Sequence, residues 1–317
     1  MSKYEFDEST LEKLDQLRQK LSDRGENLDG HLDALIHSKF LNYWDYLRIE
    51  ELLSLQHPQS EYEDEFVFIV YHQITELYFR LIIHEYDQIV YKPFSIGHFK
   101  EKMTRIDRYF DKLVHAFDIL IEGMERDQFL SMRKALLPAS GFQSAQYRYL
   151  QFYATDLINL VAFDRREALK NSSIESQFEE VYWRRGATNM ETGKKTSTLV
   201  DFEKKYDGEF LEFCRKIRHH NISRIIDENF NEVTSDEDLV KTLRNFDVQA
   251  NILWPDAHLK AVSTHMEGPG KMPSTGKTNY GKFLSASFQK IIFFPSLWTK
   301  EEKTNWGGKY FYEELAS

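Results

Sequence analysis

Hydrophobic residues recur along most of this chain at intervals of three and four, the spacing that places them on one face of a helix. Residues 8–22 show this spacing with Leu11, Leu14, Leu17 and Leu21. The sequence therefore predicts a helix close to the N-terminus, with one leucine-lined face.

The longest regular pattern covers residues 62–91 and predicts one long helix. Its apolar face consists of Phe66, Ile69, Val70, Leu77, Leu81 and Ile82. A face this broad is typical of a helix buried in a bundle. Further helical patterns lie at about 98–123, 142–165, 198–228 and 235–253.

Two stretches interrupt these patterns. Residues 170–200 are polar and broken, which predicts an excursion on the surface. Glycine and proline gather in residues 264–282, which predicts either a plain connector or a mobile flap over a site. With only seven prolines and 14 glycines in the chain, breakers are otherwise sparse. We therefore predict one all-α domain, a helical bundle, over residues 1–317.

The composition supports a large folded core. Hydrophobic residues make up 41% of the chain and aromatic residues 15%, which excludes wholesale disorder. The aromatic excess fits a protein that encloses a flat organic ligand, and it fits an ordinary large core equally well.

The charge and the cysteine count exclude several classes of protein. A net charge of −10 without a dense basic run argues against a nucleic-acid partner. The single cysteine, Cys214, cannot form an internal disulfide and suits a reducing compartment. The polar N-terminus resembles no signal peptide, and no apolar stretch approaches the roughly 20 residues of a membrane span. We expect a cytoplasmic protein without a membrane segment.

His72 lies in the middle of the predicted 62–91 helix, four residues after Phe68, so the two side chains share a face. A polar ring on a buried face needs a hydrogen-bond partner. That partner could be a ligand, or it could be Glu76 one turn further on, which would make His72 an ordinary core residue.

Arg133 follows a short helical pattern that includes Phe129. Pro138 would end this helix and leave Ser140 and Gly141 in a turn with free backbone donors. An arginine beside such a turn is suited to binding a carboxylate through two hydrogen bonds. Surface arginines near turns are common, however, so this pattern alone is weak.

His258 follows a long helical pattern, and one neutral imidazole on a helix is the usual axial ligand of a haem iron. A metal site made only of side chains is not supported, since no histidine has a glutamate three residues before it. His219 and His220 are adjacent and would point about 100° apart on a helix. No nucleotide-binding, serine-hydrolase or zinc-protease motif occurs. The remaining metal hypothesis is a cofactor that brings its own ligands.

Four blocks of sequence resemble the tryptophan 2,3-dioxygenase family. They lie at 43–56, 64–77, 129–148 and, more loosely, 253–258 with 274–276. The His-Gln-Ile-Thr-Glu-Leu string at 72–77 and the Ser-Gly-Phe-Gln-Ser string at 140–144 are specific in combination. Together the blocks span about residues 40–290.

The resemblance implies an all-helical homotetramer that binds haem b non-covalently. It implies an enzyme of tryptophan catabolism in the kynurenine pathway, which inserts dioxygen across the indole C2–C3 bond of L-tryptophan to give N-formylkynurenine. His258 matches the proximal ligand of the iron. His72 matches the distal catalytic histidine, which hydrogen-bonds the indole N–H.

The same resemblance implies a set of substrate-binding residues. Phe68 matches the aromatic residue stacked near the indole, and Arg133 the clamp on the substrate carboxylate. Thr275 matches a contact to the amino-acid head group, and Ser140 a serine close to the distal histidine. Residues that a neighbouring subunit contributes are matched by Tyr43, Tyr46 and Leu47. The N-terminal segment, about residues 1–50, is accordingly expected to be exchanged between subunits.

The sequence departs from the family pattern in two places. Where the family commonly has a Gly-Thr-Gly-Gly-Ser-Ser-Gly flap, residues 274–280 read Ser-Thr-Gly-Lys-Thr-Asn-Tyr. Pro255 precedes His258 by three residues and would kink the helix or begin a new one, so His265 is kept as an alternative iron ligand. The alternative functions are a haem monooxygenase or peroxidase-like enzyme acting on a related aromatic amino acid, and a non-catalytic haem-binding helical protein.

Overall fold

The computed structural model describes residues 6–37, 42–132, 141–189, 192–265 and 285–308. In these residues the regular elements are helices, and strand-like pairing is limited to isolated bridges, Val161 with Val181 and Thr188 with Lys195. The predicted all-α class is confirmed. Backbone packing divides the chain into two compact units, Met1–His57 and Pro58–Ser317. That the whole chain forms one domain stays a prediction.

The N-terminal unit consists of four helices. They are α1 (Glu8–Ser22), α2 (Leu28–His37), α3 (Tyr43–Leu47) and α4 (Ile49–Leu53). The predicted 8–22 helix is confirmed as α1, which begins where the Asp7 carboxylate accepts a hydrogen bond from the Thr10 N–H at 2.7 Å. Among the described hydrophobic side chains of this unit, only Leu21 and Leu28 are buried. The unit therefore has little core of its own.

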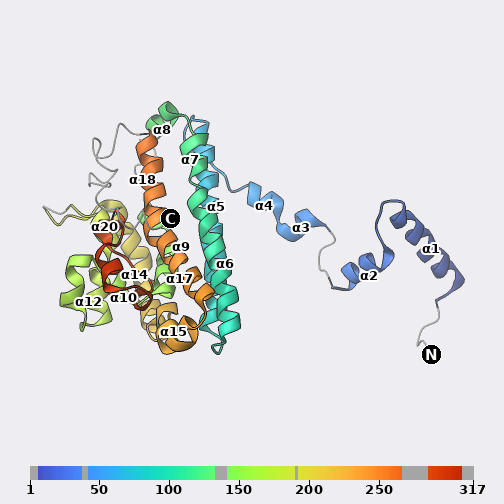
Figure 1. Ribbon diagram of the computed structural model, residues 1–317. Coiled ribbons are helices and arrows are strands. Elements are labelled where there is room, and N and C mark those ends of the chain that lie inside the picture. The colour runs from blue at the N-terminus through green and yellow to red at the C-terminus, as the bar shows by residue number, and fades with distance from the viewer. Residues whose placement is uncertain (1–5, 38–41, 133–140, 190–191, 266–284, 309–317) are drawn as a thin grey trace. The chain divides into compact units, whose positions relative to one another are not determined.

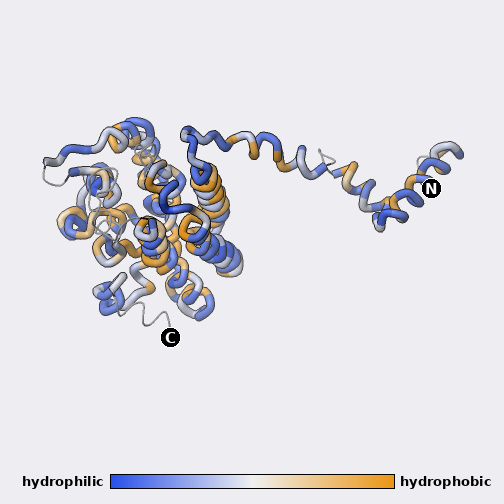
Figure 2. The backbone as a smooth tube through the Cα atoms, turned by 90° about the horizontal axis from the view of Figure 1, so that it is seen from above, coloured by the Kyte–Doolittle hydropathy of each residue, from blue (hydrophilic) through white to orange (hydrophobic). Residues whose placement is uncertain are grey.

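The larger unit is built on six longer helices (Figure 1). They are α5 (Asp64–Val90), α6 (Ile96–His115), α9 (Ala145–Ala154), α14 (Ser197–Ile217), α17 (Glu237–Val248) and α18 (Trp254–His265). Helix α5 packs along α6 and α9, α6 packs against α17, and α9 packs against α14. The predicted 62–91 helix is confirmed as α5, but its predicted buried face is wrong in part, because Phe66, Leu77 and Leu81 are exposed. Figure 2 shows the hydrophobic stretches of these helices, in orange, gathered where the helices face one another.

Short helices complete the larger unit. They are α7 (Asp118–Gly123), α8 (Arg126–Met132), η1 (Gly141–Gln143), α10 (Leu157–Leu160), η2 (Phe163–Arg165), α11 (Arg166–Leu169), α12 (Ile174–Glu179), α13 (Tyr182–Gly186), α15 (Ile222–Glu228), α16 (Phe230–Thr234), η3 (Gln249–Leu253), α20 (Ala286–Gln289), η4 (Pro295–Leu297) and α21 (Lys300–Thr304).

Local capping explains why some predicted helices are shorter in the structure. The predicted 198–228 helix is split into α14 and α15 because the Asn221 side chain accepts a hydrogen bond from the Arg224 N–H and begins a new helix. The polar stretch 170–200 carries α12 and α13, whose Phe178 and Trp183 are buried in the core. This stretch therefore contributes to the core as well as to the surface.

The buried residues of the larger unit form two clusters. The larger one, the main core, surrounds Phe79, Ile82, Tyr86, Phe110 and Phe246. The smaller one, the end cluster, comprises Tyr71, Phe117, Leu120, Met124, Met132 and Ala261, with Val67, Phe68, Phe129, Trp254 and Ala257 packed against it. It lies between α5, α7, α8 and α18, at the α8 end of the unit in Figure 1. Both candidate histidines lie beside the end cluster.

Candidate functional site

His72 is placed by α5 next to Phe68, as the spacing predicts. The two ring centroids are 4.0 Å apart, and His72 Nδ1 lies 2.7 Å from the Phe68 carbonyl oxygen. A carbonyl can only accept, so Nδ1 carries the proton. In the neutral ring, Nε2 then has a free lone pair. Because burial lowers the pKa of His72 below its ordinary value of 6.5, the ring is neutral at pH 7 and Nε2 is a hydrogen-bond acceptor.

Glu76 does not form the hydrogen bond that would make His72 an ordinary core residue. Its carboxylate instead accepts a hydrogen bond from Gln146 Nε2 at 2.9 Å. The charge of Glu76 still acts on His72 from a distance and opposes the lowering of its pKa. By its solvent-accessible surface, His72 is an exposed residue.

His258 lies on α18 and is half-buried. Burial lowers its pKa to about 4, and the charge of His72 contributes to the same shift. The two imidazoles are thus close enough for a charge on one to disfavour a charge on the other. The Phe117 ring is stacked on His258, with centroids 5.8 Å apart and planes inclined by 17°. The described part of the chain provides no side-chain hydrogen bond to the His258 ring.

His265, the alternative ligand, belongs to the core. It is 3% exposed, its Nε2 lies 2.7 Å from the Leu120 carbonyl oxygen, and its ring packs 4.9 Å from that of Phe129. Nε2 must donate to this carbonyl and therefore has no free lone pair. Of the two histidines on α18, His258 is the one with an accessible ring.

Aromatic side chains join the two imidazoles. Tyr71 meets His72 edge-on at 5.1 Å and lies 5.5 Å from Phe117, which in turn lies 4.8 Å from Trp254. Sequence reasoning did not identify Tyr71, Phe117 or Trp254 as parts of the site. Tyr71 and Trp254 lie in the sequence blocks that carry the resemblance, but Phe117 lies outside them.

Pro255 is the second residue of α18 and follows a π-helical turn, Gln249–Leu253. A new helix thus begins close to the proline, and its interior remains regular up to His265. The periodicity of the sequence did not indicate the π-turn.

Several predicted site residues cannot be placed. Arg133, Ser140 and Thr275 lie outside the described residues, and their roles stay predictions. Tyr43, Tyr46 and Leu47 lie on α3 in the N-terminal unit and are 70%, 68% and 42% exposed.

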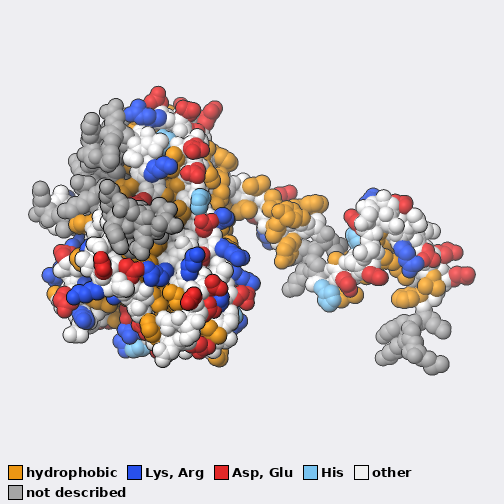
Figure 3. All heavy atoms as spheres, viewed as in Figure 1, with side chains coloured by type: hydrophobic (Ala, Val, Ile, Leu, Met, Phe, Trp, Pro, Cys, Tyr) orange, Lys and Arg blue, Asp and Glu red, His pale blue; other side chains and the backbone are white. Residues whose placement is uncertain are grey.

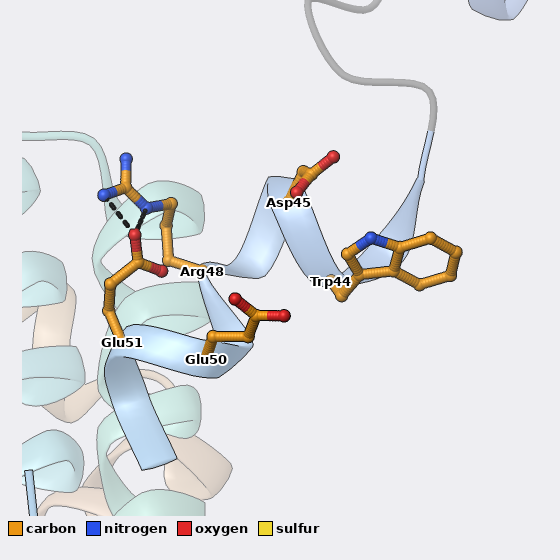
Figure 4. A pocket seen from close by; sticks show the side chains of 5 residues that line it. All are labelled: Trp44, Asp45, Arg48, Glu50 and Glu51. Carbon is orange, nitrogen blue, oxygen red and sulfur yellow. Dashed lines mark hydrogen bonds and ion pairs between the residues drawn. The ribbon is translucent and has the colours of Figure 1, made fainter. Parts of the chain in front are cut away.

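Beside these residues, the turn between α3 and α4 forms a shallow hollow of about 330 Å³ (Figure 4). Its walls are the side chains of Trp44, Asp45, Arg48, Glu50 and Glu51. Arg48 pairs with Glu51, with Nε 2.8 Å from a carboxylate oxygen, which neutralises one of the acidic side chains. The hollow gathers exposed charges and presents no set of groups in a catalytic arrangement.

The described residues contain no group of three or more histidine, cysteine, aspartate or glutamate side chains that could hold a metal ion. A metal at this site would therefore need a cofactor that supplies most of its ligands. The fold and the site together define an all-helical protein with two neutral imidazoles beside an aromatic cluster.

Comparison with known proteins identifies the family. A family model described as tryptophan 2,3-dioxygenase matches residues 29–206. This chain belongs to the tryptophan 2,3-dioxygenase family, as the resemblance predicts. The match includes the blocks around His72 and Arg133 and ends before His258.

Curated relatives named tryptophan 2,3-dioxygenase match parts of the chain. The protein from Ruegeria pomeroyi is 39% identical over 37% of this chain and 42% of its own length. That from an Anaeromyxobacter strain is 42% identical over 38% and 45%, and that from Cupriavidus necator 39% identical over 41% and 46%. The chain thus spans less than half the length of each of these relatives.

Proposed function

We propose that this protein is a haem-dependent dioxygenase that inserts both atoms of dioxygen across the indole C2–C3 bond of L-tryptophan, giving N-formylkynurenine. The observation that carries the proposal is the contact of His72 with Tyr71 and of His258 with Phe117, which places both rings beside the end cluster from two different helices. Each ring combines accessible surface with a pKa lowered by the surrounding protein. Membership of the family adds the expected chemistry.

The residues present fit a haem, whose iron would be held by a ring nitrogen of His258. A metal-binding imidazole must be neutral, and a pKa of about 4 keeps His258 neutral at physiological pH. Its ring is accessible and makes no side-chain hydrogen bond to another described residue. The surrounding side chains are largely aromatic or aliphatic, as an apolar macrocycle requires. When bound, haem supplies the activation of dioxygen that a closed-shell indole needs.

His72 is proposed to orient the substrate. Its Nδ1 is committed to the Phe68 carbonyl, so Nε2 is left to accept a hydrogen bond from the indole N–H. The Phe68 ring packs beside the imidazole and fixes its rotation. It also offers an aromatic face against which an indole can stack. These two residues would therefore hold the ring of the substrate and exclude water from it.

Arg133, Thr275 and Ser140 are proposed to bind the polar part of the amino acid. A charge-assisted fork from Arg133 to the carboxylate would fix the orientation of the substrate. Met132, the residue before it, is fully buried in the end cluster, against which Phe68 also packs. This position of Met132 supports a clamp near the indole site.

A homotetramer with exchanged N-terminal segments is also proposed. The outer side of α5 exposes Phe66, Leu77 and Leu81, and the N-terminal unit leaves most of its hydrophobic side chains uncovered. Figure 3 shows hydrophobic side chains, in orange, on the surface of both units. Apolar surface of this extent is typical of protein interfaces. Tyr43, Tyr46 and Leu47 would then complete the site of a neighbouring subunit.

We propose a cytoplasmic location without a membrane segment or a nucleic-acid partner. By length and composition alone, α5 is the one described helix that could cross a membrane. Its inward face is nevertheless packed in the protein, with Ile82 and Tyr86 fully buried, and it also carries the buried Glu65 and Glu85. These properties favour a core helix of a soluble bundle.

Single-turnover chemistry tests the proposal. Purified protein supplied with haem, reductant, isotopically labelled dioxygen and L-tryptophan should form N-formylkynurenine that carries two labelled atoms. His258→Ala should lose stable haem retention, whereas His219→Ala, an exposed histidine on another part of the unit, should retain it. Loss of haem in His265→Ala but not in His258→Ala would contradict the assignment of the ligand.

The same experiment separates the alternatives. A product heavier by one oxygen atom would indicate a monooxygenase or peroxidase-like enzyme on a related aromatic amino acid, a possibility that the altered 274–280 segment motivates. Haem uptake without consumption of any aromatic amino acid would indicate a non-catalytic haem-binding protein.

A further inference from the structure

The turn that leads into α18 has an unusual hydrogen-bond pattern. Residues Gln249–Leu253 form a π-helix, in which the Trp254 N–H donates to the carbonyl of Gln249, five residues back. Such wide turns are rare and are found frequently at functional sites. Here the π-turn joins α17 to the helix that carries His258.

Pro255 leaves a carbonyl of this turn without a donor. In the π-helical pattern the carbonyl of Ala250 would accept from the N–H of residue 255, but proline has none. Ala250 is fully buried, so water does not compensate, and an unpaired buried carbonyl is costly. The hydroxyl of Tyr147 takes the place of the missing donor, because it donates to the Ala250 oxygen at 3.4 Å.

Tyr147 belongs to α9, which brings its side chain to the π-turn. Its ring is buried between Phe79, at 5.2 Å, and Trp254, at 6.4 Å. It thus contacts the first residue of α18 with its ring and the π-turn with its hydroxyl.

Two carboxylates hold the polar side chains of the same turn. Gln249 Nε2 donates to Asp107 at 3.1 Å, and Asn251 Nδ2 donates to Asp247 at 2.8 Å. The π-turn is therefore held from three directions. The Tyr147 contact is the one made to its backbone.

We propose that Tyr147 is a positioning residue for His258: its hydroxyl replaces the donor that Pro255 lacks and so maintains the π-turn that sets the rotation of α18. Each residue of an α-helix turns the chain by about 100°. Relaxation of the π-turn to an α-turn would therefore rotate α18 and move the imidazole out of its stack with Phe117. The inference rests on the proposed role of His258 as the iron ligand.

The test compares two variants of α9 that each remove one phenolic hydroxyl. Tyr147→Phe removes the donor to the π-turn, whereas Tyr153→Phe removes the donor to Asp87 and leaves the turn untouched. In the full chain without haem, the NMR side-chain resonances of His258 report its stack with Phe117 through the ring current. Tyr147→Phe should shift them, and Tyr153→Phe should not. After haem is added, Tyr147→Phe should lose it to an acceptor protein about tenfold faster than the wild type.

A double variant distinguishes positioning from general destabilisation. Pro255→Ala supplies an N–H that can pair with the Ala250 carbonyl, so Tyr147→Phe/Pro255→Ala should restore both the His258 resonances and haem retention. Unchanged His258 resonances in Tyr147→Phe, or no rescue in the double variant, would overturn the inference. If the wild type takes up no haem, the proposed function fails, whereas the resonances still decide whether Tyr147 positions His258.

Discussion

Helix α5 passes through two environments that differ in how completely they are filled. In the main core its Phe79, Ile82 and Tyr86 are at most 2% exposed. Three turns earlier, beside the end cluster, Phe68 is half-buried and His72 is accessible. The apolar pattern continues through both regions. The pattern predicted the helix but not the face that turns inward: Ile82 is buried, whereas Phe66 and Leu77 of the same predicted face are 51% and 52% exposed.

The neighbouring elements explain the difference. Along the main core, α5 packs against the long helices α6 and α9, which cover its inward face. Beside the end cluster its neighbours include the short helices α7 and α8. The hydrophobic stabilisation of the fold is thus concentrated in the main core. The end cluster places two accessible imidazoles instead, which is the arrangement that a bound cofactor would complete.

The same substitution, Phe→Ala, can be made in the main core and beside the end cluster, and the two losses of stability can then be compared directly. Phe79→Ala in the main core should lower the free energy of unfolding by about 3–5 kcal/mol, because it removes a fully buried ring and leaves a cavity. Phe68→Ala should cost only about 1–2 kcal/mol without a ligand, because less apolar area is lost from the interior. Urea unfolding of the two variants measures both values. Equal losses would show that the end cluster is packed as tightly as the main core.

The next prediction tests whether Arg133 binds the carboxylate of the substrate near the end cluster. Arg133→Ala should weaken the binding of L-tryptophan to the haem-loaded protein by about 2–5 kcal/mol, the range for removing one partner of a buried charge pair. Calorimetric titration measures the dissociation constant. Arg126→Ala, at the start of the preceding helix α8, is the matched control and should bind as the wild type does. Unchanged affinity in Arg133→Ala would remove this residue from the site.

The sequence predicted α1 and α5 well, whereas the structure divides the helices predicted at 98–123, 142–165 and 198–228. The bounds of α1 and α5 follow its periodicity to within two residues, because each has a continuous apolar face and few breakers. Pro255 signalled the change of helix before His258. The π-turn could not be predicted, because its donor, Tyr147, lies 103 residues away from Ala250. For the same reason the stack of Phe117 on His258 was missed.

The choice between two histidines on one helix shows the same limit. His258 and His265 are seven residues apart and share a face of α18, so spacing could not tell them apart. The contact that separates them is the hydrogen bond from His265 to the Leu120 carbonyl, on α7. The resemblance favoured His258 for another reason, the Trp-Pro-Asp-Ala-His string, and the burial of His265 now supports that choice. Its role as an iron ligand stays a proposal.

The smallest expected effect is a pH dependence of stability that comes from the end cluster. Burial lowers the pKa of His258 from 6.5 to about 4, so between these values the unfolded chain binds a proton that the folded chain does not. Folding should therefore become less favourable as the pH falls from 6.5 to 4. The half-buried Asp107 and the buried Asp247, whose pKa values desolvation raises to about 6, act in the opposite direction. The informative quantity is therefore the difference in stability between a variant and the wild type at each pH.

Without haem, His258→Gln should lose less stability than the wild type on acidification, as urea unfolding at each pH would show. The exposed His219→Gln should follow the wild type. Parallel curves for His258→Gln and the wild type would mean that the ring is hydrated and that no enclosed recess surrounds it.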